Sequence, residues 1–207
     1  MKRAKGSNRL IISSILTNSF IMQKLFSLTA VVLVALVSAV EAQSFRAPDK
    51  SPMDMAYYPD HFAHDRKPGD KAMIRVTYSR PLANGRDVFG ELAPYGEVWR
   101  TGANEAAEIK FYQDVTIDGQ ELAAGTYSLF TIPEKDAWTV IFNKDLDYWG
   151  AYSYDQQQDV LRASAPTTSL DEPLDAFSIQ FEQGEDDSEA IMHLGWDDKV
   201  ASLPIEL

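Results

Sequence analysis

The sequence predicts an all-β protein with the architecture of an antiparallel β-sandwich, of the Greek-key or jelly-roll kind. Apolar residues alternate with polar residues in several short segments, for example at Phe177, Ile179 and Phe181, and this period of two is typical of strands with one buried face. Gly, Pro and Asp separate these segments, as they do in turns. After residue 42 no apolar stripe of helical period extends over three turns. Short strands at such spacing favour two packed antiparallel layers.

The first 42 residues predict a cleaved export signal. An uncharged apolar run occupies 25–40, and it is shorter than the roughly 20 residues that a membrane span needs. Ala42 ends a pattern of small residues of the kind that precedes a signal-peptidase cut. Met22 is the expected translation start, with 1–21 as a gene-model extension; a long basic leader is the alternative. The mature protein would be periplasmic or secreted, with no membrane insertion after cleavage.

The chain after residue 42 is strongly acidic. Lys and Arg number 19, of which five lie in the first 42 residues, and Asp and Glu number 31, of which one lies there. The remaining 14 basic and 30 acidic residues give a net charge of −16. Because this field repels phosphate backbones and anionic lipids, neither nucleic acid nor a membrane surface is an expected partner. The acids are dispersed and form no calcium-loop pattern, which indicates a solvated surface.

The expected elements follow in order along the chain. Residues 43–70, rich in Pro, Asp and Lys, predict an extended segment lying along a β-sandwich domain at 71–207. Asp118-Gly119 predicts a two-residue hairpin turn, and Tyr127 stands where a tyrosine corner would tie down a connection. The period-two segments place strands at 74–78, 109–111, 115–117, 120–122, 128–132, 138–142, 177–181, 190–196 and 200–205, with an acidic turn at 184–188.

A glycine-rich segment that concentrates charged and aromatic residues is the first candidate site. Its arginines could clamp a carboxylate or a phosphate, with neighbouring polar groups as hydrogen-bonding partners. The alternative is an internal network in which the arginines pair with nearby glutamates and hold a long connection in place. The network is favoured, because long loops need such contacts and no nucleophile accompanies the arginines. The candidate residues are Arg80, Arg86, Trp99, Arg100, Asn104 and Glu105.

A second candidate is the aromatic loop at 148–154, which carries four rings and follows Lys144. Exposed rings such as Trp149 on loops of β-sandwiches often stack on sugar faces. The alternative is a hydrophobic lid that closes one end of the core, and this simpler interpretation is favoured. Lys144 and Trp149 therefore join the candidate ligand-binding set.

These segments resemble a known family. The phrase Trp-Arg-Thr-Gly-Ala-Asn-Glu at 99–105, together with 78–81, 125–133, 138–141 and 149–152, is similar to the hallmark phrases of the bacterial domain-of-unknown-function family 2911, whose members are exported envelope proteins. The resemblance covers nearly all of the chain after residue 42. It implies the location and the architecture, and it implies no reaction, ligand or residue role.

Neither a metal site nor a cofactor is expected. His61 and His64 are three residues apart with Asp60 and Asp65 beside them, but this spacing is common, and a third ligand such as His193 would have to come from far along the chain. The chain has no cysteine, which excludes disulfides and thiolate ligands. No serine-hydrolase elbow, phosphate-binding glycine loop or dinucleotide fingerprint occurs.

The leading functional hypothesis is a non-enzymatic binding module for a small anionic or carbohydrate ligand. The alternative is an envelope hydrolase acting on glycans or peptides, with Glu97 or Glu105 as general acid or base. Such a group must be kept protonated by burial or by a like charge. The neighbouring arginines would act in the opposite sense, so binding ranks first. The sequence leaves the oligomeric state open.

Overall fold

The computed structural model of the protein describes residues 19, 22–24 and 44–207, of which Pro48–Leu207 form one compact unit. The expected export signal falls almost entirely outside the described residues, so cleavage after Ala42 stays a prediction. In the part of the chain that is described, no helix is long and apolar enough to cross a membrane.

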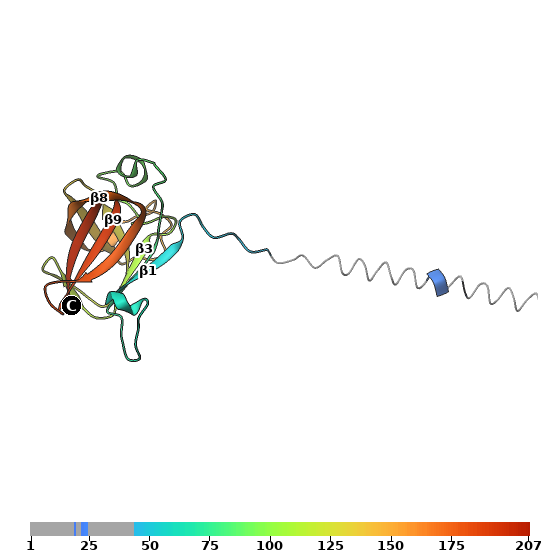
Figure 1. Cartoon of the computed structure of the whole chain (residues 1–207), viewed down its shortest axis with the longest axis horizontal. Coiled ribbons are helices and arrows are strands. Elements are labelled where there is room, and N and C mark those ends of the chain that lie inside the picture. The colour runs from blue at the N-terminus through green and yellow to red at the C-terminus, as the bar shows by residue number, and fades with distance from the viewer. Residues whose placement is uncertain (1–18, 20–21, 25–43) are drawn as a thin grey trace, which may run out of the picture. The chain divides into compact units, whose positions relative to one another are not determined.

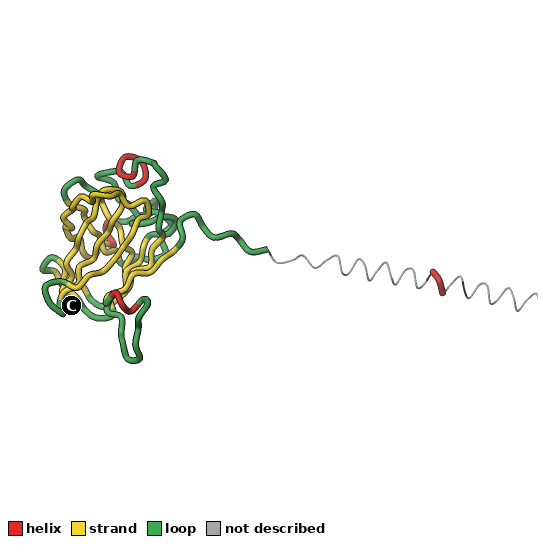
Figure 2. The backbone as a smooth tube through the Cα atoms, viewed as in Figure 1, coloured by secondary structure: helices red, strands yellow, loops and turns green. Residues whose placement is uncertain are grey.

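Nine strands form a single antiparallel sheet, which confirms the all-β antiparallel prediction (Figure 1). Their order across the sheet is β1-β2-β3-β6-β7-β8-β9-β4-β5. Within the compact unit the helices are short turns, coloured red in Figure 2: η1 (Asp60–Phe62), η2 (Val88–Leu92) and η3 (Gln156–Gln158). The strands are β1 (Met53–Tyr58), β2 (Ile74–Ser79), β3 (Ala107–Phe111), β4 (Val115–Ile117), β5 (Gln120–Leu122), β6 (Gly125–Ile132), β7 (Ala137–Asn143), β8 (Asp159–Gln183) and β9 (Glu189–Glu206).

The long strand β8 belongs to both halves of the sheet. Its first part pairs with β7, up to Ala137 opposite Pro166, and its second part pairs with β9 from Thr167 onward. The β8–β9 register shifts between Ser169 and Leu174, where Pro173 has no N–H to donate to a ladder. The structure therefore differs from the expected pair of sheets in one respect, because hydrogen bonding continues from one half to the other through the bent β8.

The bent sheet closes on itself where β2 continues into residues 80–83. The Ala83 N–H donates to the Asp175 carbonyl at 2.7 Å, and the Phe177 N–H donates to the Pro81 carbonyl at 3.0 Å. These bonds bring the inward faces of β2 and β8 opposite each other around the core.

Aromatic rings fill the core between these faces. Trp99 packs on Trp196 with ring centroids 5.4 Å apart and on Phe177 at 4.8 Å. Trp138 meets Trp99 edge-on at 6.3 Å, and all four side chains are buried. A smaller cluster is separate from this core and lies where the two candidate loops meet; its buried members are Ala106, Phe130, Ile141 and Tyr148.

The sheet begins earlier in the chain than residue 71. Met53–Tyr58 is an edge strand that pairs with β2 from Met53 opposite Ser79 to Tyr58 opposite Ile74. Ala56 and Tyr58 are buried. The segment 43–70 therefore supplies part of the sheet and of the core, where an extended covering segment was expected.

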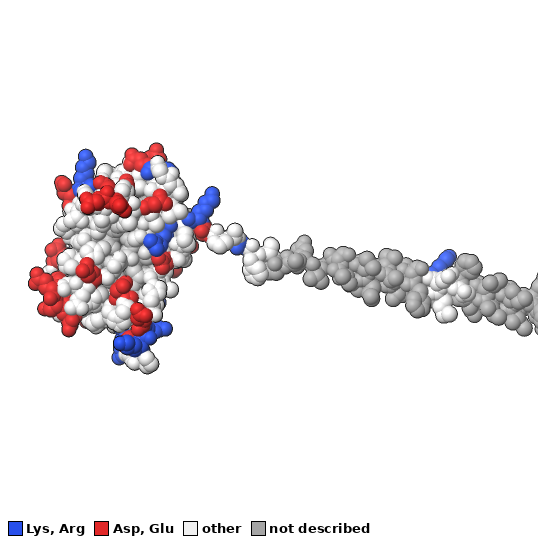
Figure 3. All heavy atoms as spheres, in the orientation of Figure 1, with Lys and Arg blue, Asp and Glu red and all other residues white. Residues whose placement is uncertain are grey.

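Two local predictions are confirmed. Asp118 and Gly119 link β4 and β5 with φ of 51° and 69°, the positive angles that a two-residue hairpin turn requires. The Tyr127 hydroxyl donates to the Ala123 carbonyl at 2.9 Å, which is the bond of a tyrosine corner. The acidic side chains are spread over the visible face of the compact unit (Figure 3), as expected for a solvated surface.

Candidate functional site

The guanidinium of Arg80 is committed to contacts within the fold. Its Nε donates to the Phe177 carbonyl at 3.1 Å, its Nη1 to Asp54 at 3.0 Å and its Nη2 to the Ser178 hydroxyl at 2.6 Å. The three nitrogens thus tie β2 to β8 and to β1. These contacts agree with the internal-network interpretation and leave no nitrogen of Arg80 without a partner inside the fold.

Arg86 likewise binds its own turn. Its Nε donates to the Ala83 carbonyl at 2.9 Å and its Nη2 to the Leu82 carbonyl at 2.6 Å. Backbone carbonyls are thus its partners, where glutamates were expected. The predicted three-arginine clamp is not formed, because two of its members are engaged in separate structural contacts.

The loop 99–105 carries the motif most specific to the family that the sequence resembles. Several of its residues pack against β6 and β2. Trp99 exchanges two backbone hydrogen bonds with Thr131 of β6, at 2.7 and 2.9 Å. Thr101 is fully buried, and its hydroxyl lies 3.2 Å from that of Thr131. A Cβ on Gly102 would lie 3.0 Å from the Ser79 carbonyl oxygen. Only glycine therefore fits at 102 without displacing β2.

Arg100 differs from the other two arginines. It is half-buried, and its Nε is buried without a hydrogen-bond partner. Among the residues that the structure describes, its guanidinium takes part in no ion pair, although its backbone carbonyl accepts the Ala107 N–H at 3.0 Å. Of the three predicted arginines, Arg100 is thus the one with a buried Nε that has no hydrogen-bond partner in the described part of the chain, and this atom is closed to an external anion.

Three of the predicted residues do come together. The Gly150 N–H donates to the Asn104 carbonyl at 2.9 Å, and Glu105 pairs with Trp149 in an isolated β-bridge. The Asn104 side chain also donates to Asp49 at 3.1 Å. The structure therefore places Asn104, Glu105 and Trp149 side by side, on two loops joined by backbone hydrogen bonds.

The rings of the aromatic loop divide between the interior and the surface. Tyr148 is buried against Phe130, with ring centroids 5.3 Å apart, as the lid interpretation expects. Trp149 is 61% exposed and Tyr152 is 86% exposed. We call these two rings the aromatic surface. The loop thus combines a buried ring, as the lid interpretation expects, with two exposed rings, and sugar stacking on these two stays a prediction.

A buried polar network that the sequence analysis missed lies under this loop. Asn143 is fully buried; its amide donates to Asp159 at 2.9 Å, and its Oδ1 accepts the Asp145 N–H at 3.0 Å. The Tyr154 hydroxyl donates to Asp159 at 2.6 Å and accepts from Arg162 at 2.7 Å. Burial, together with the hydrogen bond to Asp159, raises the pKa of Tyr154 to about 12.

The sequence indicates only some members of this network. Asn143 and Asp145 stand in a turn sequence directly after a strand, where a buried Asn often satisfies backbone groups. Lys144, between them, points its charge to solvent, while its N–H donates to the Gln158 carbonyl at 2.9 Å. No local pattern indicates that Asp159 and Arg162 complete the network.

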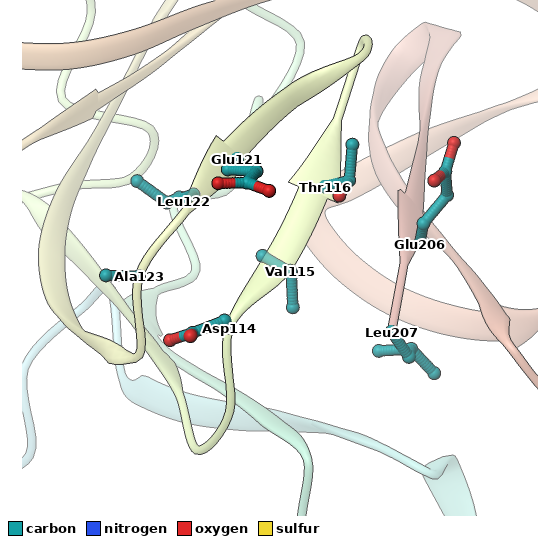
Figure 4. A pocket seen from close by; sticks show the side chains of 8 residues that line it. All are labelled: Asp114, Val115, Thr116, Glu121, Leu122, Ala123, Glu206 and Leu207. Carbon is teal, nitrogen blue, oxygen red and sulfur yellow. The ribbon is translucent and has the colours of Figure 1, made fainter.

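Two surface hollows lie away from the predicted residues. One, of about 430 Å³, is lined by the β4–β5 hairpin and the end of β9. Figure 4 shows Asp114 and Glu121 on the hairpin side and Glu206 near the chain end. The other, of about 490 Å³, is bordered by Tyr95 and by the Lys199–Asp198 ion pair of 2.9 Å.

The histidines have structural or solvent partners. His61 lies 3.6 Å from Asp70, and His64 is exposed. The Nδ1 of His193 lies 2.9 Å from the Ser202 hydroxyl. Over the described ranges, no three His, Asp or Glu side chains are grouped so that they could hold a metal ion.

The fold and these contacts define an all-β domain whose candidate site is an exposed aromatic surface on hydrogen-bonded loops. A family described as a protein of unknown function (DUF2911) matches residues 60–205, and the chain belongs to this family. The match includes the loop 99–105 and the aromatic surface. No curated protein and no solved structure matches the chain at a significant level.

Proposed function

We propose that this protein is an exported binding module of the bacterial envelope that holds a carbohydrate on its aromatic surface. The observation that carries the proposal is the exposure of Trp149 and Tyr152, at 61% and 86%, on a loop whose backbone is fixed to its neighbour. An exposed indole in a soluble protein leaves a large apolar area in water. A sugar face is a suitable occupant, because it is apolar between its hydroxyl groups.

The surroundings of Trp149 supply the polar groups that a sugar needs. Asn104 and Glu105 lie on the adjoining loop, and Glu105 is exposed next to Trp149. Amide and carboxylate groups beside a ring can bind the hydroxyls at the edge of a pyranose while the ring covers its face. The fixed loop reduces the entropy that binding must overcome.

The hydrolase alternative receives less support from the contacts. Glu97 and Glu105, its expected acid or base residues, are both exposed. A general acid that works near neutral pH usually owes its protonation to burial or to a second carboxylate close by. Exposed carboxylates beside a ring are better suited to hydrogen bonding with a ligand.

The test is a titration with neutral oligosaccharides, such as cellohexaose and chitohexaose, followed by calorimetry for every variant and also by tryptophan fluorescence for proteins that retain Trp149. Trp149 should dominate the response, because Trp99, Trp138 and Trp196 are no more than 4% exposed. We expect Trp149→Ala to weaken binding about tenfold or more, the loss of one stacked ring.

Met53→Ala is the matched control, since Met53 is 60% exposed and lies on β1, outside the aromatic surface. It should bind like the unaltered protein. The proposal fails if no neutral oligosaccharide binds at millimolar concentration, or if Trp149→Ala binds as well as Met53→Ala does.

A further inference from the structure

A continuous series of positively charged and aromatic side chains crosses the outer face of the sheet at β1, β2 and β3. Arg75 of β2 stands opposite Tyr57 of β1 on one side and opposite Lys110 of β3 on the other. Side chains at such positions are direct neighbours on one face. All three alternate with buried residues along their strands, so they face outward.

Rings and cations extend this series at both ends. The Lys110 ammonium lies 4.6 Å from the centre of the Tyr112 ring. The Tyr57 ring lies 5.2 Å from that of Phe62, and the Arg66 guanidinium lies 4.8 Å from the centre of the Phe62 ring. We call this series the cation–aromatic row, and its members are Arg66, Phe62, Tyr57, Arg75, Lys110 and Tyr112.

The cations of the row have no counterion within the fold. In the described part of the chain, none of Arg66, Arg75 and Lys110 forms an ion pair, and the Arg75 Nε is buried without a hydrogen-bond partner. Like charges directly opposite each other on neighbouring strands destabilise a sheet. The acid nearest along β3 on this face, Glu108, stands opposite Thr77 and forms no ion pair with either cation among the described residues, so both cations retain charge for an external anion.

We infer that the cation–aromatic row binds a segment of an acidic polysaccharide. Arg75 offers a planar fork and Lys110 a point charge to the same carboxylate group. Tyr57 and Tyr112 stand on either side of this pair and offer ring faces to the sugars on either side of the carboxylate. The row is separate from the aromatic surface, and it would recognise charged rather than neutral sugars.

The net negative charge of the protein does not prevent this binding. Exposed charges farther than about 8 Å are screened at physiological ionic strength. The row itself holds no acid; the nearest acid along β3 on this face is Glu108, opposite Thr77 in the next register position, which is about 7 Å away along the strand, inside the screening distance, and offsets part of the positive charge. Figure 3 shows basic side chains together at the lower end of the compact unit.

The test is calorimetric titration of the protein with hexagalacturonate, with cellohexaose as a neutral ligand of the same length. We expect hexagalacturonate to bind, and Arg75→Gln and Lys110→Gln each to weaken it about tenfold, the loss of a charged hydrogen bond. Lys135→Gln, at an exposed lysine outside the row, should bind normally.

Other results would overturn the inference. Loss of hexagalacturonate binding in Trp149→Ala, with Arg75→Gln unaffected, would assign acidic sugars to the aromatic surface. A hexathymidine oligonucleotide that bound as tightly as hexagalacturonate would assign the row to single-stranded nucleic acid. One further result separates the two proposals. If neutral sugars do not bind and hexagalacturonate binding depends on Arg75, the proposed function is wrong and the inference about the cation–aromatic row is supported.

Discussion

The three arginines of the predicted clamp show how contacts decide the role of a residue. Arg80 donates from two nitrogens to β8 and from the third to β1, whereas Arg86 binds only its own turn. Among the described residues, the Nε of Arg100 has no hydrogen-bond partner. Residue type alone indicates anion binding for all three, and only the hydrogen-bond partners distinguish a structural arginine from an available one.

Arg80→Ala should lower the free energy of unfolding by about 1–3 kcal/mol, because it breaks hydrogen bonds from a charged group across two strands. Arg86→Ala, which removes bonds within one turn, should cost less than about 1 kcal/mol. Urea denaturation measures both changes, and carbohydrate binding should survive in each variant. Equal losses for the two variants would contradict a bridging role for Arg80.

Hydrogen bonds from the buried Asn143 side chain and from the neighbouring loop hold the aromatic loop in place. The Asn143 side chain binds Asp159 and the Asp145 N–H in the turn before the loop. Backbone hydrogen bonds with Asn104 and Ala106 hold the loop itself. Gly150 has a φ of 68°, and a Cβ there would lie 2.8 Å from the Tyr152 ring. The ring of Tyr152 thus lies directly on the glycine.

Gly150→Ala should therefore displace Tyr152, weaken binding of neutral oligosaccharides several-fold, and cost about 1 kcal/mol of stability through its positive φ. Gly119→Ala is the matched control, since its φ is 69° and its Cβ would meet nothing within 4 Å. It should lose similar stability and bind normally. Normal binding by both variants would show that the position of Tyr152 does not matter.

For the whole molecule, the sequence predicted the strands that obey period two and missed those that do not. Residues 74–78, 138–142 and 177–181 alternate clearly, and each lies in a strand. The middle of β8 is rich in Ser, Thr, Asp, Glu and Pro, which locally resembles a loop. Its strand geometry comes from pairing with β7 up to Pro166 and with β9 at 167–169 and at Leu174, and tertiary pairing of this kind overrides propensity.

The candidate site was predictable to the extent that its contacts are local. The exposed Trp149 loop could be recognised from its composition. The hydrogen-bond partners of Arg80 could not be predicted, because Phe177 is 97 positions away. No local pattern encodes which strands meet across the core. The cation–aromatic row was missed for the same reason, since it exists only once the register of β1, β2 and β3 is known.

The stability of the whole molecule should depend on pH through Tyr154. Its pKa is raised from 10 to about 12, so below pH 10 both the folded and the unfolded state hold the proton. Between these two values only the folded state retains it, and stability falls as the pH rises through this window. Other buried tyrosines, such as Tyr78, have a pKa raised by burial and add to the fall.

Tyr154→Phe should make the loss of stability between about pH 10 and 12 shallower. The same variant should cost about 1 kcal/mol at neutral pH, the value of a lost hydrogen bond. Urea unfolding at several pH values measures both effects. An identical slope in the variant and in the unaltered protein would contradict a raised pKa at this position.

The shared strand β8 also determines when the core can form during synthesis. Trp99 meets Phe177 of β8 and Trp196 of β9, so its ring has no complete site until both strands have left the ribosome. Contacts between residues far apart in sequence slow folding and leave apolar surface exposed meanwhile. The nascent chain would thus stay open to chaperones for most of its synthesis.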